Sequence, residues 1–464
     1  MKKIIALILV CIFTLSFTAC KDGKTETKND GKVTITIGAW PNKDKNPTGY
    51  ERKEAQRLAF MEKYPNINVE TDSWGYSVDT FLPKAAANQL PTYFYLPFTE
   101  VDKVVDAGYV ADITDAMKEY GFTENLKKEM IDFVSRNGKI YMIPDSYYAM
   151  GIGANRAVFK EAGLLNDDGT VKYPETFEEL AETASAIKKK TGKAGLIFPT
   201  MNNAGGWHFM NIAWNYGTEF MKKKDGKWVA CFDSDECAKA LQYVKDLKWK
   251  YDALSDNLFI DNAEGIKMLG SGQGAMYMTT VDDNLLRATV VRNGMNKDDL
   301  SMGSMPKGPK GHISLMGGAV YAIPSSATKE QIDAVFKWIE FTGKGYTLTD
   351  DSKKSIEDSF KNNIAEGLPV IGKIPFTVWK DGEVVNYTSE KRKEYGNLDL
   401  KYFNDYFKFD GIELKTEEPV CAQELYSILD ECIQEVLSNK DADVKAILKD
   451  ANKKFQLNYL DNEE

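Results

Sequence analysis

Residues 33–37 read VTITI, residues 51–64 read ERKEAQRLAFMEKY, and residues 67–70 read INVE. The first and last stretches alternate apolar and polar residues, as strands do, while the middle stretch has helix-forming composition and is stopped by Pro65. A strand, a helix and a second strand within about forty residues form a βαβ unit, whose two strands lie parallel. The sequence therefore predicts a parallel sheet near the start of the folded chain.

The rest of the chain continues this mixture of helices and strands. Thr176 and Thr328 each stand three residues before a Glu or Gln, which is the capping pattern of a helix start, and glycines at 192 and 343 mark the ends of these helices. Apolar residues at helical spacing predict two further helices, over 425–437 and 444–455. We therefore predict a mixed α/β fold throughout.

Two tryptophans stand just beyond the predicted strands. In open α/β sheets, ligands bind beyond the carboxyl ends of the strands. Trp40 and Trp74 occupy such positions, with Asn42, Ser73 and Tyr76 as polar neighbours. A strand-end tryptophan can also fill the core, but two of them among polar residues favour a ligand-binding wall that includes Tyr76.

Composition excludes several classes of function. The chain has 464 residues, 59 basic and 69 acidic, with a formal net charge of −10. Its length suggests two or three domains. It has only two histidines, His208 and His312, so a His-rich metal centre is excluded and a catalytic triad has little choice of base. An acidic chain without a basic tract is also a poor candidate for binding nucleic acid.

The N-terminus has the pattern of an exported lipoprotein. Two lysines precede an apolar run of ten residues, Ile4 to Phe13, which is far shorter than the roughly 20 residues of a membrane-spanning helix. The run ends in LSFTAC at 15–20, which resembles a bacterial lipoprotein box. We expect a signal peptide over 1–19, a lipid on Cys20 and a solvated tether over 20–32. An ordinary signal peptide is the alternative.

Four cysteines would remain after this processing. Cys421 and Cys432 lie eleven residues apart along one helical pattern, about 16 Å along its axis, so they cannot bridge each other. Cys231 and Cys237 could pair, although free thiols are favoured. No cysteine spacing suggests a zinc site.

Six sequence blocks occur in one order over about residues 33–345. They read LAFMEKYPNINV at 58–69, DAGYVADI at 106–113, GKIYMIP at 138–144, NRAVF at 155–159 with AGL at 162–164, SGQGAM at 271–276, and MPKGP at 305–309 with GGAVYAIP at 317–324. Together they resemble the extracellular solute-binding proteins, family 1, of bacterial sugar-uptake ABC transporters. The chain departs from the family at 89–92, where QLPT replaces the Gly-x-Pro-Asp of many relatives, so the contact made by that Asp is not assumed here.

The resemblance implies a two-lobed, periplasmic-binding-protein-like fold (type II) with a ligand cleft between the lobes. Carried over to this chain, it implies that lobe 1 comprises 33–145 and 299–342, and that lobe 2 comprises 146–298 and 343–464. The first crossing between the lobes would follow residues 141–144.

It also implies a role. The protein would be a monomeric binding protein on the outer face of the cell membrane, held there by the lipid on Cys20. It would capture a sugar, with an oligosaccharide expected, and deliver it to the permease subunits of an ABC transporter. No enzymatic activity, cofactor or metal is expected.

Several binding residues follow from the resemblance. Trp207 falls where relatives place an aromatic residue that stacks on sugar. Trp214, seven residues later, can share its helix face, although a core position for Trp214 is favoured. Tyr148 matches a cleft-lining position. Asp282 stands where relatives often have an aromatic residue, which would replace ring stacking by hydroxyl recognition or by pairing with a cation.

Other positions complete the expected cleft. Thr99 and Glu100 match polar positions of lobe 1, and Gly317 and Gly318 allow close backbone approach at the cleft floor. His208, between two aromatic residues, is expected to pack or hydrogen-bond rather than to catalyse. The acidic loop at 166–169 lacks the spacing of an EF-hand and is interpreted as a solvated turn.

Two alternatives stay open. A glycosidase would need two carboxylates about 5–10 Å apart, and no motif nominates such a pair. The same fold could instead bind a peptide, a polyamine or a phosphorylated compound, for which Asp282 is the main argument.

Overall fold

The βαβ unit predicted at the start of the chain is present. Strand β1 (Val33–Ile37) pairs in parallel with β2 (Ile67–Thr71), with Val33 opposite Ile67, and α1 (Pro47–Lys63) connects them. The helix begins four residues earlier than predicted. Asn46 caps it by accepting a hydrogen bond from the Gly49 amide at 3.0 Å, and the proline in its first turn has no amide hydrogen to leave unpaired.

The computed structural model describes residues 31–373, 376–408 and 411–462. The predicted signal peptide, Cys20 and most of the predicted tether lie outside these residues. Within them, no helix has both the length and the apolar composition that crossing a membrane requires.

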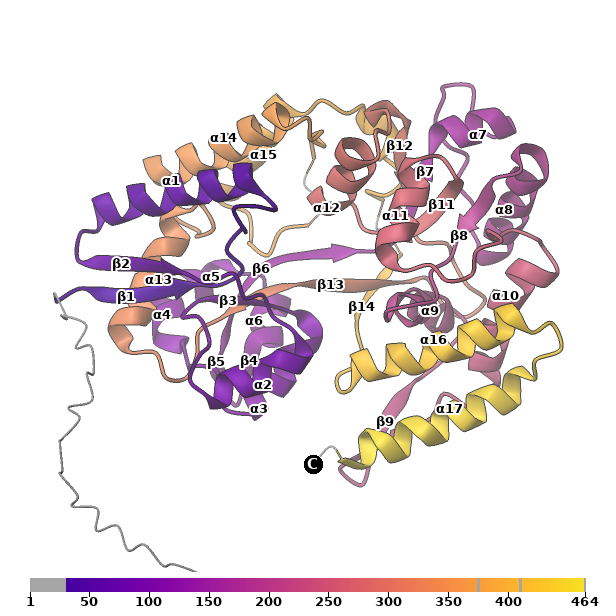
Figure 1. The fold of residues 1–464 in the computed structure, drawn as a ribbon, viewed down its shortest axis with the longest axis horizontal. Coiled ribbons are helices and arrows are strands. Elements are labelled where there is room, and N and C mark those ends of the chain that lie inside the picture. Colours follow the sequence, from indigo (N-terminus) through magenta and orange to yellow (C-terminus); the bar gives the residue numbers. More distant parts are fainter. Residues whose placement is uncertain (1–30, 374–375, 409–410, 463–464) are drawn as a thin grey trace, which may run out of the picture.

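The buried apolar side chains form two large clusters, which define the two lobes (Figure 1). Lobe 1 has its core in residues 35–143, 320–339 and 378–379, and lobe 2 has its core in residues 150–315 and 422–460. A smaller third cluster, drawn from 197–302 and 368–407, extends lobe 2. The chain therefore visits each lobe more than once.

Lobe 1 surrounds β1 and β2 with short helices and strands. The segment at 89–92 is tied to β1, because Thr92 Oγ1 accepts a hydrogen bond from the Thr36 amide at 3.0 Å. The further elements of this lobe are α2 (Val78–Ala86), β3 (Phe94–Pro97), a 3₁₀ turn (Phe98–Glu100), α3 (Val101–Asp106), α4 (Thr114–Glu119), α5 (Phe122–Asn125), α6 (Lys128–Val134), β4 (Ser135–Arg136), β5 (Lys139–Ile140) and α13 (Lys329–Phe341).

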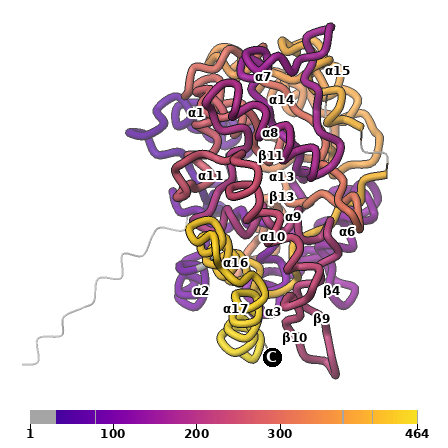
Figure 2. Tube along the Cα trace, turned by 90° about the vertical axis from the view of Figure 1, so that its right-hand side faces the viewer, coloured from indigo at the N-terminus to yellow at the C-terminus, as the bar shows by residue number. Residues whose placement is uncertain are grey.

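Lobe 2 contains a four-stranded sheet in the order β12-β7-β11-β8, covered by helices. Helices α16 and α17 lie against each other at its lower end (Figures 1 and 2). Its elements are β7 (Gly151–Asn155), α7 (Arg156–Ala162), α8 (Phe177–Thr191), β8 (Ala194–Ile197), α9 (Ala204–Asn215), β9 (Met221–Lys224), β10 (Lys227–Ala230), α10 (Asp235–Trp249), α11 (Asn262–Gly270), β11 (Gly274–Thr279), α12 (Asp283–Leu286), a π-helix (Arg287–Arg292), 3₁₀ turns (Lys297–Asp299, Leu400–Tyr402, Leu460–Asn462), β12 (Leu300–Gly303), α16 (Ala422–Ser438) and α17 (Val444–Asn458).

The predicted helix starts are confirmed. Thr328 and Gln331 form a reciprocal capping box at the start of α13. Thr176 caps α8 by accepting from the Glu179 amide at 3.1 Å, but the Glu179 carboxylate binds the amide of Glu175 rather than that of Thr176. The two apolar stripes near the end of the chain are the buried faces of α16 and α17.

Two long antiparallel strands connect the lobes (Figure 1). Strand β6 (Met142–Ala149) begins at the crossing predicted after residues 141–144, and β13 (Ile313–Ala322) returns beside it. A third strand, β14 (Glu413–Thr416), lies parallel to β13. The chain therefore passes between the lobes along β6 and β13, and β14 lies beside them at the junction.

The predicted lobe boundaries differ from the structure in two places. Strand β12, within the stretch 299–342 expected in lobe 1, pairs with β7 of the lobe 2 sheet. Helix α14 (Asp350–Ala365), expected in lobe 2, instead packs on α1 of lobe 1, where Gln56 donates to Ser355 at 3.4 Å, and α15 (Glu383–Tyr395) packs on α14. Contacts between residues far apart in the sequence determine both placements, so local sequence patterns could not predict them.

Candidate functional site

Two strand ends meet at the middle of β13. Met316 pairs with Ala149 of β6 and with Thr416 of β14, so these two strands lie on opposite edges of β13. Ala319 pairs likewise with β6 and with Pro97 of β3. Strands β14 and β3 therefore share one edge, and because one is parallel and the other antiparallel to β13, their carboxyl ends point at each other opposite Gly317 and Gly318.

The two glycines let side chains lie directly on β13. A Cβ atom on Gly317 would lie 2.4 Å from the Tyr148 hydroxyl oxygen. A Cβ atom on Gly318 would lie 2.5 Å from both the Phe98 ring and the Ser146 carbonyl oxygen. The neighbours of these glycines are thus Tyr148, Phe98 and the Ser146 backbone of the protein itself, and their predicted role at the floor of a binding cleft stays a prediction.

Polar residues of lobe 1 gather just after β3. Tyr76 donates its hydroxyl hydrogen to Glu100, and Thr99 Oγ1 donates to the same carboxylate at 3.3 Å. Glu100 is only 4% exposed. Burial and the Glu100 carboxylate raise the pKa of Tyr76, so its hydroxyl stays protonated and remains a donor. Tyr76, Thr99 and Glu100 are thus brought together as expected.

On the lobe 2 side, Glu417 follows β14 directly. Its carboxylate accepts a hydrogen bond from the buried Tyr426 hydroxyl at 2.7 Å and lies near the Trp207 side chain in the first turn of α9. Burial, together with the nearby Glu100 carboxylate, raises the pKa of Glu417 to about 7. The ring of Trp207 is half-buried.

These groups form one interlobe cluster. Its residues are Tyr76, Tyr95, Thr99, Glu100, Tyr148, Trp207, Asp282 and Glu417. The pKa of Tyr148 is raised by burial and by the electrostatic influence of Glu417, Tyr95 and Asp282. The Glu424 carboxylate, at the start of α16, likewise raises the pKa of Tyr76. The cluster thus combines aromatic rings and carboxylates from both lobes.

Asp282 belongs to the cluster and also caps a helix. One carboxylate oxygen caps α12 by accepting from the Leu285 amide at 2.9 Å, and the other accepts from the Thr280 hydroxyl at 2.9 Å. The half-buried side chain therefore adds negative charge beside Tyr148 while it holds the helix start.

The prediction of a binding wall at the strand ends is wrong for Trp40. This residue is 5% exposed and packs on Trp338 in the lobe 1 core, with ring centroids 6.5 Å apart. The chain turns at Ala39, whose φ is 51°, and backbone bonds to residues 72 and 74 continue the pairing of this segment. Trp74 is half-buried, contacts Phe94, and donates its N–H to Thr80 at 3.0 Å.

Trp214 also lies in a core, as the favoured alternative had it. The residue is 2% exposed, and its N–H donates to the buried Glu418 at 3.2 Å. His208 is buried as well, with its ring nitrogens 2.6 and 2.7 Å from the carbonyl oxygens of Ala204 and Met278. It ties α9 to β11, in agreement with a hydrogen-bonding role.

Two minor expectations are also answered. Cys231 and Cys237 are free thiols rather than a disulfide. The acidic loop at 166–169 is a hydrogen-bonded turn, in which the Gly169 amide donates to the Asn166 carbonyl at 2.9 Å.

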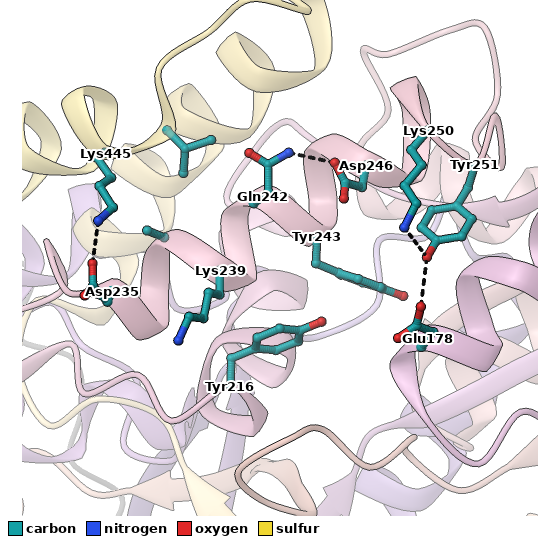
Figure 3. A pocket seen from close by; sticks show the side chains of 12 residues that line it. Glu178, Tyr216, Asp235, Lys239, Gln242, Tyr243, Asp246, Lys250, Tyr251 and Lys445 are labelled. Carbon is teal, nitrogen blue, oxygen red and sulfur yellow. Dashed lines mark hydrogen bonds and ion pairs between the residues drawn. The ribbon is translucent and has the colours of Figure 1, made fainter.

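A separate groove of about 520 Å³ runs along α10 on the surface of lobe 2 (Figure 3). Its polar side chains bind one another: Lys445 pairs with Asp235 at 2.6 Å, and Gln242 donates to Asp246 at 2.6 Å. Tyr243 donates its hydroxyl hydrogen to a backbone carbonyl at 2.6 Å. The groove is built from one lobe alone, whereas the interlobe cluster draws on both.

Sequence reasoning missed Glu417, Glu424 and Tyr95. Glu417 and Glu424 follow the last recognisable sequence block by about a hundred residues, and only the pairing of β14 with β13 brings that segment between the lobes. Tyr95 carried a usable signal, since it alternates with the buried Phe94 and Leu96 and is itself 39% exposed.

Comparison with known proteins places this geometry in a family. The family described as "Bacterial extracellular solute-binding protein" matches residues 43–342. A multiple sugar-binding protein of Streptococcus mutans serotype c is 25% identical over 191 residues, which span 41% of this chain and only 42% of that relative.

Solved structures share the fold at low identity. An ABC transporter solute-binding protein from Thermotoga lettingae, bound with α-D-tagatose, superimposes with a TM-score of 0.67 at 19% identity, covering 91% of this chain and 98% of that one. UgpB from Mycobacterium tuberculosis, in complex with glycerophosphocholine, gives 0.66 at 15% identity, covering 92% and 98%. The chain has their two-lobed fold, and it belongs to the family of bacterial extracellular solute-binding proteins.

Proposed function

We propose that this protein captures a sugar, specifically an oligosaccharide, at the interlobe cluster and delivers it to the permease of an ABC transporter. The observation that carries the proposal is the convergence of aromatic rings and carboxylates from both lobes opposite Gly317 and Gly318.

The chemistry of the cluster suits a carbohydrate. Sugars present apolar C–H faces bordered by hydroxyl groups, which aromatic rings and hydrogen-bonding side chains recognise. Trp207 and Tyr95 offer partly exposed rings, while Glu100 and Glu417 can accept hydrogen bonds from hydroxyl groups. A ligand that touches both lobes at once favours the conformation in which they are closest, which couples capture to a change of shape.

The relatives give independent support. One curated relative is a multiple sugar-binding protein, and one structural neighbour holds tagatose. A neighbour that holds glycerophosphocholine keeps a non-sugar ligand as the alternative within the same fold, whether peptide, polyamine or phosphorylated compound.

The test is a thermal-shift panel of neutral oligosaccharides, amino acids, short peptides, spermidine and glycerophosphocholine. We expect an oligosaccharide to raise the melting temperature, following RT ln(1 + [L]/Kd). Stabilisation by a peptide or by spermidine, with no effect of any sugar, would contradict the sugar assignment. Glycosidases use a pair of facing carboxylates for catalysis, so the bound sugar is recovered after incubation and analysed. Hydrolysed product would contradict the proposed binding role.

The cellular setting is part of the proposal. The N-terminal sequence supports export, removal of 1–19, lipidation of Cys20 and attachment of a monomer to the outer face of the cell membrane. In cells that express the full chain, the protein should sediment with membranes, and a Cys20→Ser variant should not carry the lipid. Sedimentation with lipid still attached in that variant would exclude Cys20 as the anchor.

A further inference from the structure

Glu417 reaches the interlobe cluster from outside the part of the chain that matches the family. The match ends at residue 342, whereas Glu417 lies on the segment between β14 and α16. Its position is fixed from two sides, by the pairing of Thr416 with Met316 and by the hydrogen bond from Tyr426. Glu417 therefore lies on the C-terminal segment beyond the matched residues, and contacts on two sides hold it at the junction between the lobes.

The charges around Glu417 are mostly negative. Glu100 faces it from lobe 1, Asp282 acts with it on Tyr148, and Glu424 adjoins Tyr76. The next acid along the chain, Glu418, is buried with Trp214 and lies 3.9 Å from Lys415. The interlobe cluster thus contains three carboxylates, those of Glu100, Asp282 and Glu417, and Glu424 of α16 acts on it through Tyr76.

Two lysines adjoin the cluster beyond Tyr95. Tyr95 contacts Tyr321 edge-on, with ring centroids 6.2 Å apart, and Tyr321 accepts a hydrogen bond from Lys344 at 3.1 Å. Lys344 is already paired with Asp145 at 2.7 Å. Burial and the charge of Lys344 lower the pKa of Lys53 to about 8, and the Asp145 carboxylate acts on Lys53 in the opposite direction. Both lysines thus interact with Asp145 on the far side of Tyr95 and Tyr321 from the Glu417 carboxylate.

We propose that Glu417 determines the charge class of the ligand: the interlobe cluster takes uncharged sugars and amino sugars, and it rejects sugars that carry a carboxylate or a phosphate. This inference rests on the proposed function. Hydroxyl and ammonium groups donate hydrogen bonds, which a carboxylate accepts. An anionic group placed among Glu100, Asp282 and Glu417 would meet like charges in a partly desolvated site, where their repulsion is poorly screened.

The test uses disaccharides in matched triplets that differ only in charge. Each triplet contains a glucose disaccharide, the corresponding 2-amino-2-deoxyglucose disaccharide and the corresponding glucuronic acid compound, in α1,4- and β1,4-linked forms. Calorimetric titration of the full chain at pH 8, where a carboxyl group with a pKa of about 7 is mostly ionised, compares wild type with Glu417→Gln. Glu413→Gln is the matched control, because this residue lies exposed at the start of β14, the strand that Glu417 follows.

In the wild type we expect the acidic member of a binding triplet to bind at least tenfold more weakly than the neutral member, and the amino member to bind at least as tightly. Glu417→Gln should shrink the neutral-to-acidic ratio at least threefold, whereas Glu413→Gln should leave it unchanged. Trp207→Phe keeps an aromatic ring beside Glu417 but makes it smaller, so it should weaken all members alike.

Each other result overturns a defined part of the account. An acidic member that binds as tightly as the neutral one overturns the inference and leaves sugar capture intact. An unchanged ratio in Glu417→Gln, or an equally reduced ratio in Trp207→Phe, shows that Glu417 is not the determinant. If every member of every triplet fails to bind, along with the whole oligosaccharide panel, the proposed function itself fails. The wild-type ratio alone keeps the inference testable if the variant does not fold.

Discussion

Two tryptophans of helix α9, seven residues apart, each lie beside one of two consecutive glutamates, and the two pairs lie in different surroundings. Trp207 and Glu417 belong to the interlobe cluster, with the Trp207 ring half-buried. Trp214 and Glu418 are 2% and 8% exposed and belong to the lobe 2 core. Seven residues of helix span about 10 Å, while successive residues of an extended chain point to opposite sides, so one short segment reaches both rings.

This difference shows what residue type cannot reveal. The pair Trp214–Glu418, which one lobe encloses, stabilises the fold. The pair Trp207–Glu417, which lies between the lobes, is the one we propose as a contact for the ligand. Our account therefore predicts that changes at 214 and 418 affect stability, whereas changes at 207 and 417 affect binding.

The largest effect is expected for Trp214→Ala. Truncation of a buried large aromatic residue costs about 3–5 kcal/mol of unfolding free energy, because packing is lost and a cavity remains. It also leaves the buried Glu418 without its donor. Urea denaturation measures the loss, and titration of the folded fraction should give an unchanged ligand affinity. A stability loss below 1 kcal/mol would remove the contrast between the two pairs.

Trp207→Ala should act on binding instead. Loss of the ring face that stacks on sugar is expected to weaken affinity at least tenfold, or about 1.4 kcal/mol, which calorimetric titration measures. The loss of unfolding free energy should be less than half that of Trp214→Ala. If Trp207→Ala binds as tightly as the wild type but unfolds more easily, then Trp207 is a core residue like Trp214.

The pH dependence of stability should reveal Glu417. Burial first, and then Glu100, raise its pKa from 4.5 to about 7, so the folded protein holds a proton that the unfolded chain releases. Its contribution to stability is complete below pH 4.5 and is lost as the pH rises through 7. The melting temperature of Glu417→Gln relative to wild type should therefore increase between pH 5 and pH 8. A difference that stays constant across this range would show that Glu417 does not titrate there.

The smallest effect is expected for Gly317→Ala. The new Cβ would meet the tip of Tyr148 at 2.4 Å, and the end of a tyrosine side chain can move aside at little cost. We expect a stability change within about 1 kcal/mol and a severalfold loss of affinity, because Tyr148 is displaced. Titration and denaturation of the same preparation measure both. Unchanged affinity would remove Tyr148 from the binding surface.

Much of the fold could be predicted because it is encoded locally. The unit β1-α1-β2, the capped starts of α8 and α13, and the buried faces of α16 and α17 all follow from short patterns. Trp40 was misplaced because a strand-end position does not tell on which side of the chain the ring lies. The placement of α14 on lobe 1 depends on contacts with α1 about three hundred residues earlier in the chain.

The candidate site was predicted only in part, for the same reason. Tyr76, Thr99, Glu100, Tyr148, Trp207 and Asp282 were found and are brought together in the interlobe cluster. Glu417 could not be found, since the pairing of β14 with β13 joins positions a hundred residues apart and leaves no local pattern.

The most direct test of the central claim is a crystal structure of the protein with the oligosaccharide that gives the largest thermal shift. The account predicts a sugar ring stacked on Trp207, with hydroxyl groups bound to Glu100 and Glu417 and the ligand opposite Gly317 and Gly318. A ligand bound in the groove along α10, or one that contacts a single lobe and leaves Trp207 and Glu417 untouched, would contradict it.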